Sequence, residues 1–519
     1  MARADEPQRG GPGRKSPRAT AGFGAGFGEK SHNPAPDKKR VPAEAGANTG
    51  RRRLTANRPG KTAGPPDGPR ADARADARIG QTVKPVAQRE SVLPGAVISR
   101  RAADRLRSGH VWVYASELES LELGPGEAPA LLPVADNRGI LLGTALYSPA
   151  SQIGLRMISR EPIDEPQWLE LLAARLRRAI DVRMMMLSPL EGKSDSCRLC
   201  FSEADQIPGL VIDKYADLVV LQLLTKGLDR ETVRETCVKV LRETLLNPDY
   251  GAAREAGGLA AIWERPDPRI RELEGLPAPT AGPLWAANAK APKTETQFHL
   301  NGLSFFYDAN AGQKTGAFLD QHANYHSAQK YAWLKAPGGR ALDVCTYQGG
   351  FALHLARVSK TVTGIDASRG SLEVAERNLK ANQAQPKAGI QAEVDWIEAD
   401  AFEILRDWSA AGQQFDTIVL DPPAFAKSKR AVEGALRGYK ELNLRALKML
   451  RPGGLLISCS CSHHVSWADL EGAVAAAAAD AGRRVRLLDR LGAAPDHPVV
   501  LNLPETEYLK CLVLEKDRD

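Results

Sequence analysis

Three stretches of the chain differ in how apolar and polar residues alternate along them. In the first, apolar runs are short and are separated by turn residues such as Asn137-Arg138-Gly139 and Ser148-Pro149. Short runs bounded by turns are typical of a small β-barrel or sheet domain. We therefore expect a β domain over residues 91–162.

Residues 163–308 mix two periodicities. The run "EPQWLELLAARLRRAIDVRMMM" has apolar residues at helical spacing, whereas "GLVIDKYADLVVLQLL" has the pattern of a β-hairpin. Near the end, "TETQFHLNGLSFFYDAN" alternates around Asn301-Gly302, and Asn-Gly between alternating runs is a strong hairpin signal. The pattern predicts an α+β middle domain.

From residue 309 to 519, strand, loop and helix follow one another repeatedly. The predicted strands are "RALDVC", "TVTGIDAS", "AEVDWIEAD", "FDTIVLDPPAF" and "LLISCSCS", and helical runs such as "GSLEVAERNLKANQ" lie between them. The run "YKELNLRALKMLRPGG" is expected to be a helix that its final glycines cap. Alternation at this length predicts an α/β domain with a parallel sheet covered by helices on both faces. Because such sheets bind ligands beyond the carboxyl ends of their strands, the residues after each strand are the candidates for chemistry.

The first 90 residues lack this patterning. They are rich in Gly, Pro, Ala and Arg, and they carry 19 basic and 9 acidic residues, a net charge of +10. The remaining 51 basic and 54 acidic residues give a net charge of −3. We predict a disordered basic tail over residues 1–90, since it cannot bury enough apolar area to offset its chain entropy. An RNA tether and a solvated tail without a specific role both remain open for it.

Bulk properties narrow the class of protein. A chain of 519 residues is too long for one core, so several domains are expected. No run of about 18 apolar residues and no secretory signal are present, so we expect no membrane span. Seven cysteines without framework spacing fit a reducing compartment, and the cytoplasm is the expected location.

Acidic residues and a glycine turn follow the first three strands of the α/β domain. Asp343 and the turn ending in Gly349-Gly350 follow the first strand, Asp366 ends the second, and Asp400 ends the third. Paired glycines let a ligand approach the backbone, and an acid after the second strand suits the hydroxyls of a ribose. Since neither G-x-G-x-x-G nor a Walker A loop is present, this arrangement favours S-adenosylmethionine, with Asp400 facing the adenine amino group.

The fourth and fifth strands end in Asp421-Pro422-Pro423-Ala424-Phe425 and in "SCSCSHH" (458–464). Asp421 could hydrogen-bond the edge of a base, and Phe425 could stack on its face. The cysteines and histidines of the second motif are too close together in sequence to surround one tetrahedral zinc ion, so we predict no metal. Cys459 falls on the strand and is expected to be a buried structural thiol, whereas Cys461 falls where the strand opens and is a candidate nucleophile.

These motifs carry a family resemblance. From about Val92 to the end, the chain resembles bacterial 23S rRNA (cytosine-5-)-methyltransferases that join a PUA domain to a class I methyltransferase. The successive motifs are "GHVWVYASE", "YSPASQIGLR", "EADQIPGLVIDKY", "GQKTGAFLDQ", "LDVCTYQGGFALHLA", "DPPAFAKSKR", "RGYKELNLRALKMLRPGG", "SCS" and "DHPVVLNLPETEYLK". The chain departs from the family's pattern at His322, where arginine is common, and at His463, where glycine is common. Both departures bear on the RNA contact more than on the chemistry.

The resemblance implies a PUA-like RNA-binding domain over residues 91–162 and a Rossmann-like domain with a mostly parallel seven-stranded sheet over residues 309–519. It implies S-adenosylmethionine as cofactor, large-subunit rRNA as partner, and Cys461, not Cys459, as the nucleophile. The residues expected to bind the cofactor are Asp343, Cys345, Tyr347, Gly349, Asp366, Ala367, Asp400, Ala401 and Asp421. Those expected on the substrate side are Gln321, Pro422, Phe425, Lys427 and Lys429, with Cys461 and Asp421 as the catalytic pair.

Two other functions compete with this one. A methyltransferase acting on a guanine nitrogen would share the Asp-Pro-Pro-x-Phe loop but would need no cysteine. A non-catalytic RNA-binding assembly factor would keep the fold but would not need all of Asp343, Gly349, Asp366, Asp400, Asp421 and Cys461. The sequence does not fix the oligomeric state, for which a homodimer is one option, or the target nucleotide.

Overall fold

The β-type runs that begin near residue 92 form one six-stranded sheet. The computed structural model describes residues 95–518 except 125–129, 188–192, 248–257, 278–281, 311–315 and 427, so the predicted basic tail and Lys427 lie outside the described residues. The strand order is β2-β6-β5-β4-β1-β3, with β1 parallel to β4 and the other pairs antiparallel. The elements are β1 (Ala96–Ile98), α1 (Arg100–Arg107), β2 (Trp112–Tyr114), η1 (Ala115–Glu117), β3 (Leu118–Leu121), β4 (Leu131–Asp136), β5 (Leu141–Tyr147) and β6 (Ile153–Ser159).

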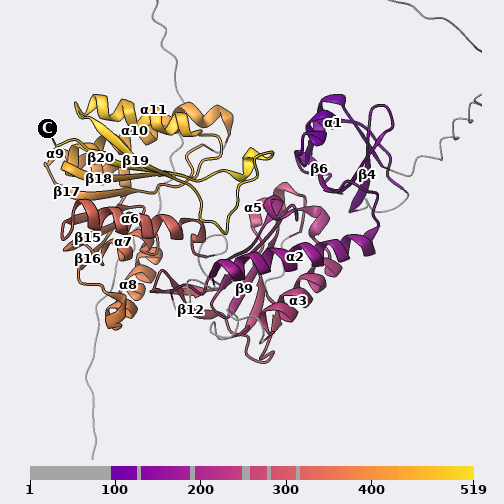
Figure 1. The fold of residues 1–519 in the computed structure, drawn as a ribbon, viewed down its shortest axis with the longest axis horizontal. Helices are drawn as coiled ribbons and strands as arrows, with labels where there is room; N and C mark the ends of the chain where they lie inside the picture. Colours follow the sequence, from indigo (N-terminus) through magenta and orange to yellow (C-terminus); the bar gives the residue numbers. More distant parts are fainter. Residues whose placement is uncertain are drawn as a thin grey trace, which may run out of the picture. The chain divides into compact units, whose positions relative to one another are not determined.

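The middle of the chain forms a second sheet with the order β11-β10-β9-β8-β7. Every residue of β8 and β9 is buried, and α2 lays the fully buried side chains of Leu172, Leu176 and Ile180 into the same core. Figure 1 shows α2 and α3 beside these strands. The elements are α2 (Glu165–Leu187), β7 (Cys197–Phe201), η3 (Ser202–Asp205), β8 (Leu210–Tyr215), β9 (Leu218–Leu223), η4 (Lys226–Leu228), α3 (Glu231–Leu245), β10 (Ala261–Glu264), α5 (Pro268–Leu273) and β11 (Gly282–Ala286).

The predicted hairpin around Asn301-Gly302 is confirmed. The strands β12 (Glu295–Leu300) and β13 (Leu303–Asp308) pair in register, and the φ angles of Asn301 and Gly302 are 52° and 76°. Two left-handed residues in succession make the turn that matches the twist of a hairpin. The hairpin docks on α8 (Arg369–Gln383), where Asn382 Oδ1 accepts from Ser304 N at 2.8 Å.

A buried histidine ties the hairpin turn to α7 (Gly350–Leu355). The Nδ1 of His354 lies 2.7 Å from Gly350 O, and its Nε2 lies 3.0 Å from Asn301 Nδ2. Since a carbonyl can only accept, Nδ1 carries the hydrogen and Nε2 accepts from the amide. The side chain is fully buried, and this burial lowers the pKa of His354 to about 3.

We therefore expect His354 to make the protein less stable in acid. Its imidazole binds a proton near pH 6.5 when unfolded but only near pH 3 when folded, so stability is lost as pH falls through this window. Between pH 7 and pH 5 the loss amounts to about 2 kcal/mol. Urea unfolding at both pH values measures it, and the His354→Asn variant should show a drop smaller by that amount. An unchanged pH dependence in the variant would contradict this assignment.

The C-terminal sheet has seven strands in the order β16-β15-β14-β17-β18-β20-β19, and all are parallel except β20, which runs antiparallel to both of its neighbours, β18 and β19. Successive residues of one strand point to opposite faces. Ala341 and Val419 pack with α6 and α7, whereas Leu342 and Ile418 pack with α10 and α11. The predicted α/β class, with helices on both faces, is confirmed (Figure 1).

The remaining elements belong to this sheet and its helices. They are η5 (Leu319–Gln321), α6 (His322–Lys335), β14 (Arg340–Val344), β15 (Thr361–Asp366), η6 (Pro386–Ala388), β16 (Glu393–Glu398), α9 (Ala401–Ala410), β17 (Phe415–Leu420), η7 (Lys429–Ala431), α10 (Val432–Met449), β18 (Leu450–Ser460), α11 (Trp467–Asp480), β19 (Val485–Leu491), η8 (Pro504–Thr506) and β20 (Lys510–Lys516).

One local expectation from the sequence is wrong. The stretch Arg451-Pro452-Gly453-Gly454 was expected to cap the helix before it, but it belongs to β18, which begins at Leu450. Gly453 has a φ of 76°, and a Cβ on Gly454 would lie 2.9 Å from the backbone oxygen of Asp416. The two glycines therefore let the strand bend closely past its neighbour β17 instead of ending the helix.

Among the described residues, no helix combines the length and the apolar character that crossing a membrane requires. The seven cysteines are all described, and none of them forms a disulfide.

Candidate active site

The glycine turn after β14 is built on a buried carboxylate. Asp343 is fully buried, and its Oδ2 accepts hydrogen bonds from Thr346 Oγ1 at 2.6 Å and from Ala352 N at 2.9 Å. Its Oδ1 is buried without a hydrogen-bond partner among the described residues, and burial raises the pKa of Asp343 to about 7. Asp343 thus holds the turn in place through Oδ2 and leaves Oδ1 as an acceptor for another group.

The turn itself holds an unusual backbone. Cys345, Tyr347 and Gly349 have φ angles of 62°, 50° and 85°. Left-handed conformations are costly for residues other than glycine, and they cluster where a loop is shaped for a ligand. Turns of this kind aim several N–H groups into one concavity. The Tyr347 hydroxyl fixes the loop from outside by donating to Gly316 O at 2.9 Å.

Two further acids close the same edge of the sheet. Asp366 Oδ2 accepts from Tyr347 N at 2.9 Å, which joins the end of β15 to the turn. Asp400 caps α9, since its Oδ1 accepts from Phe402 N at 2.9 Å and from Glu403 N at 3.1 Å. A carboxylate can accept about four hydrogen bonds, so both acids retain acceptor sites for a ligand.

Asp421 stands at the end of β17, at the centre of the sheet. Gln321 Nε2 donates to its Oδ1 at 2.9 Å. Burial, together with the negative charges of Asp320 and Asp343, raises the pKa of Asp421 to about 8. Near neutral pH this carboxyl group is therefore mostly protonated and can act as a hydrogen-bond donor.

Cys461 follows β18 directly, beside this loop. Its Sγ lies 3.9 Å from Pro422 O, and the side chain is half-buried. The flanking serines are both tied to one residue of α10, because Ser460 Oγ donates to Tyr439 OH at 2.8 Å and Ser462 Oγ lies 3.1 Å from it. The two serines of the motif thus hold the cysteine between them.

Cys459 has a different environment. It is fully buried and lies opposite Cys511 of β20. Its hydrogen bond with Cys511 and its burial raise the pKa of Cys459 well above that of an ordinary thiol. A thiol that resists ionisation is a poor nucleophile, as expected for the structural cysteine.

Two residues of the site were not singled out from the sequence. One is Tyr439, which holds the serines, and the other is Lys510 of β20. Lys510 Nζ donates to Ser462 O and to Tyr508 O, both at 3.0 Å. Burial lowers the pKa of Lys510, and the neighbouring Glu507 and Cys461 offset only part of this shift. A lysine directly before the apolar run "CLVL" was the available signal, because buried lysines are rare.

The predicted substrate residues are not all equally open. The Phe425 ring packs on Tyr439 at 4.9 Å and on Phe402 at 5.9 Å between centroids, so part of it belongs to the core. Lys429 is exposed at the start of η7. His463 and His464 are exposed, and the described residues contain no group of His, Cys, Asp and Glu arranged to hold a metal ion.

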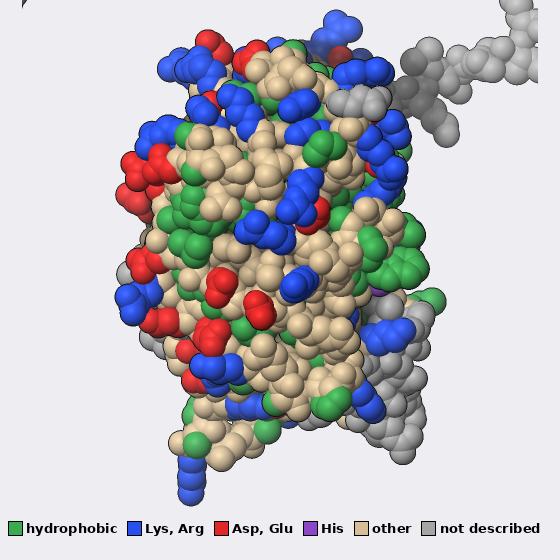
Figure 2. Space-filling view, turned by 90° about the vertical axis from the view of Figure 1, so that its left-hand side faces the viewer, with side chains coloured by type: hydrophobic (Ala, Val, Ile, Leu, Met, Phe, Trp, Pro, Cys, Tyr) green, Lys and Arg blue, Asp and Glu red, His purple; other side chains and the backbone are tan. Residues whose placement is uncertain are grey.

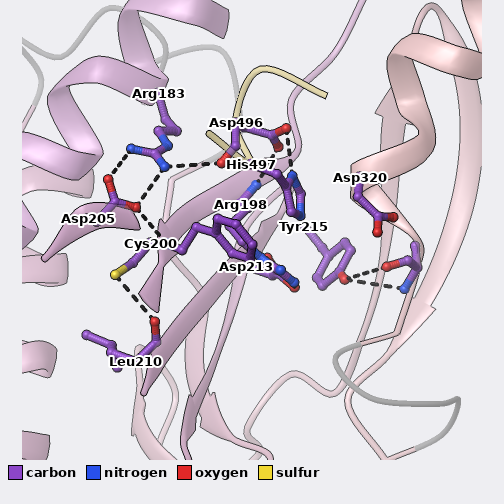
Figure 3. A network of polar contacts seen from close by, with 12 residues as sticks. Arg183, Arg198, Cys200, Asp205, Leu210, Asp213, Tyr215, Asp320, Asp496 and His497 are labelled. Carbon is purple, nitrogen blue, oxygen red and sulfur yellow. Dashed lines mark hydrogen bonds and ion pairs between the residues drawn. The ribbon is translucent and has the colours of Figure 1, made fainter. Parts of the chain in front are cut away.

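A buried ionic network links the site to the middle sheet (Figure 3). Asp496 precedes β20; its Oδ2 accepts from Arg198 N at 2.8 Å and its carbonyl accepts from Arg183 Nη2 at 3.1 Å. Arg183 also forms a two-pronged pair with Asp205, with both contacts at 2.7 Å. These bonds join α2 and β7 to the segment that leads into Tyr508 and Lys510.

Comparisons with known proteins agree with this geometry. Residues 97–160 match the model of a PUA-like domain, and residues 278–513 match that of an S-adenosylmethionine-dependent methyltransferase. A methyltransferase of solved structure from Streptococcus mutans covers 82% of this chain and all of its own, with a TM-score of 0.65 at 18% identity, which supports the fold. Another, solved with SAH, has a TM-score of 0.64 at 18% identity, with the same coverage of both chains.

Curated relatives are closer in sequence. Ribosomal RNA large subunit methyltransferase I of Pseudoalteromonas translucida is 34% identical over 81% of this chain and 99% of its own length. That of Aeromonas salmonicida is 34% identical over 78% of this chain and 95% of its own. With the turn, the acids and the cysteine motif in place, and with relatives matched along almost their whole length, the chain belongs to the S-adenosylmethionine-dependent methyltransferase family of ribosomal RNA large subunit methyltransferase I.

Proposed function

We propose that this protein methylates carbon 5 of a cytosine in large-subunit ribosomal RNA, in the cytoplasm, through a covalent bond between Cys461 and the base. The observation that carries the proposal is the contact between Cys461 Sγ and the carbonyl oxygen of Pro422, the residue that follows Asp421. The name of the curated relatives supports ribosomal RNA as the substrate. A guanine nitrogen is already nucleophilic and needs no thiol, so a held cysteine at this place favours carbon 5.

The residues at the glycine turn fit S-adenosylmethionine. Asp343 Oδ1, which has no hydrogen-bond partner in the described part of the chain, offers an acceptor, and the left-handed turn at Cys345, Tyr347 and Gly349 offers N–H groups. We assign Asp366 with Ala367 to the ribose hydroxyls, and Asp400 with Ala401 to the adenine edge. The Ala401 N–H suits this role because it lies in the first turn of α9, where backbone N–H groups lack a helical partner.

The chemistry follows from the reactivity of the ring. Carbon 5 of cytosine is a poor nucleophile until the Cys461 thiolate adds to carbon 6 and makes the ring enamine-like. Asp421 holds the ring near N3 and the exocyclic amine, where charge develops. Bound S-adenosylmethionine supplies the electrophilic methyl group that carbon 5 then takes up. A base removes the proton from carbon 5, and the thiolate leaves as the ring double bond returns.

Basic side chains support RNA contact. Lys and Arg side chains gather in the upper half of the face shown in Figure 2. A cavity of about 310 Å³ is lined by Arg160 of the PUA-like domain and Arg175 of α2. Arg175 donates to Gln206 O at 2.8 Å, and burial lowers its pKa. Because the target base must leave its stack to reach Cys461, the protein must hold the neighbouring RNA nucleotides through contacts to their phosphates.

The assignment of Asp366 gives a prediction for cofactor affinity. Asp366→Ala removes a charged acceptor of the ribose hydroxyls, and each such bond is worth about 1.5–3 kcal/mol. We expect the Kd for S-adenosylmethionine, measured by calorimetry, to rise by roughly 10- to 100-fold. Asp395→Ala, which removes an exposed carboxylate of β16, is the matched control and should bind normally. Equal affinity of both variants would contradict the assignment.

The proposed function is tested by the product. Purified protein, labelled S-adenosylmethionine and unmodified large-subunit rRNA are incubated, and the RNA is digested to nucleosides. Labelled 5-methylcytidine is the expected product. A labelled methylguanosine would replace the proposal by nitrogen methylation, and failure to bind S-adenosylmethionine would favour a non-catalytic RNA-binding role.

A further inference from the structure

A chain of amides leads from the β19–β20 connection to the catalytic carboxyl group. Asn324 of α6 donates from Nδ2 to Gly492 O at 3.0 Å and to Gln321 Oε1 at 2.6 Å. Gln321 in turn donates from Nε2 to Asp421 Oδ1 at 2.9 Å. Asn324 and Gln321 are only 2% and 3% exposed, so water does not compete for these bonds.

The direction of the hydrogen bonds in this series of amides is fixed by the first amide, that of Asn324. The oxygen and nitrogen of a side-chain amide can exchange places by a flip, so its direction must come from its partners. Gly492 O is a carbonyl and can only accept, so Asn324 presents its nitrogen. That nitrogen then selects the oxygen of Gln321, and the Gln321 nitrogen is left to face Asp421. Asp421 Oδ1 therefore always receives a hydrogen bond.

We propose that Asn324 and Gln321 are positioning residues that make Oδ1 of Asp421 an acceptor and place the carboxyl proton on Oδ2, ready for N3 of the target cytosine. The proposal rests on the proposed function and assigns this pair a role in the same step. No described residue donates to or accepts from Oδ2. Oδ2 is therefore the oxygen that remains for the base.

The proton movement balances through the step. As the Cys461 sulfur bonds to carbon 6, the electrons of the carbon 5–carbon 6 double bond move toward N3, which takes the proton from Oδ2. Asp421 becomes a carboxylate, stabilised by the Gln321 N–H. After carbon 5 has been methylated, the N3–carbon 4 double bond re-forms and N3 returns the proton to Asp421. A carboxyl proton held on Oδ1 could not make this transfer without a rotation.

The test inverts the chain without touching Asp421 or Cys461. In Asn324→Asp the side chain has at most one hydrogen to donate in place of two, and Gly492 O takes it. Gln321 Oε1 then loses its donor, so the Gln321 amide flips and presents an oxygen to Asp421. That oxygen holds the carboxyl proton on Oδ1. We expect kcat for 5-methylcytidine formation to fall roughly 10- to 100-fold, while KM for RNA and Kd for S-adenosylmethionine stay unchanged. The basic limb of the pH–rate profile should move to higher pH, because the flipped amide favours the protonated carboxyl group.

Two further variants complete the experiment. Gln321→Leu removes the donor to Asp421 at similar volume. It should also lower kcat and move the basic limb of the pH–rate profile to higher pH. If Asn324→Asp does not fold, Gln321→Leu alone tests the positioning role. Asn382→Asp, a buried change at the hairpin, is the control and should leave the pH profile in place. If the wild type forms 5-methylcytidine and the two site variants keep its rate and pH profile, the positioning role is wrong. If the wild type forms another nucleoside, the proposed function fails first and the positioning role fails with it.

Discussion

Replacement of Cys461 by alanine should lower the rate of methyl transfer to RNA by at least about four orders of magnitude. Without a thiolate on carbon 6, carbon 5 of cytosine has no enamine character and cannot take up a methyl group at a useful rate. Four orders of magnitude correspond to about 5.5 kcal/mol of lost transition-state stabilisation. Single-turnover transfer of labelled methyl groups to rRNA measures the loss.

Cys459→Ala is the matched control for this prediction. Cys459 is two residues away on the same strand, but it is fully buried and lies opposite Cys511. We expect this variant to lose less than about tenfold in rate, together with some stability from the lost packing. An active Cys461→Ala variant, or an inactive Cys459→Ala variant that still folds, would rule out the assignment of the nucleophile.

The largest effect on stability is expected at Asp496. Its burial alone would raise its pKa, but His497 and His322 beside it hold the pKa of Asp496 well below the usual range. Asp496→Ala would leave the Arg198 N–H and the His497 imidazole without their buried acceptor. Breaking such a buried charged cluster from one side costs about 3–5 kcal/mol in free energy of unfolding.

Urea unfolding of Asp496→Ala checks this value against a surface control. Asp480 is half exposed and pairs with Lys440 at 2.7 Å, so Asp480→Ala should cost less than about 1 kcal/mol. Because the network joins α2 and β7 to the segment before Lys510, Asp496→Ala should also slow methyl transfer. Equal stability of the two variants would show that the buried network does not hold these parts together.

Features encoded locally could be predicted from the sequence. Asn301-Gly302 specifies its own turn, and the repeated strand and helix patterns specify a sheet covered on both faces. The position of Cys461 at the end of a strand follows from the same pattern. The glycines of Arg451–Gly454 were misplaced because both a helix end and a bent strand can use them, and only the neighbouring strand β17 decides between the two.

Features that depend on distant contacts could not be predicted. Asn324 lies 97 residues before Asp421 in sequence, and nothing near it indicates that it orients Gln321. Tyr439 and Lys510 lie within motifs that were recognised, but their roles appear only when α10 and β20 pack beside Cys461. Likewise, the pattern could not show that the Phe425 ring packs against the rings of Tyr439 and Phe402.

The most direct test of the covalent mechanism is to trap the adduct. RNA that carries 5-fluorocytidine at the target can accept the thiolate and the methyl group, but carbon 5 then has no proton to lose, so the enzyme stays attached. We expect a complex stable to denaturation that requires S-adenosylmethionine, with the methylated nucleotide on the peptide that contains Cys461 in mass spectrometry. A complex attached through Cys459 or Cys345, or complete turnover of the fluorinated RNA without any adduct, would contradict the mechanism.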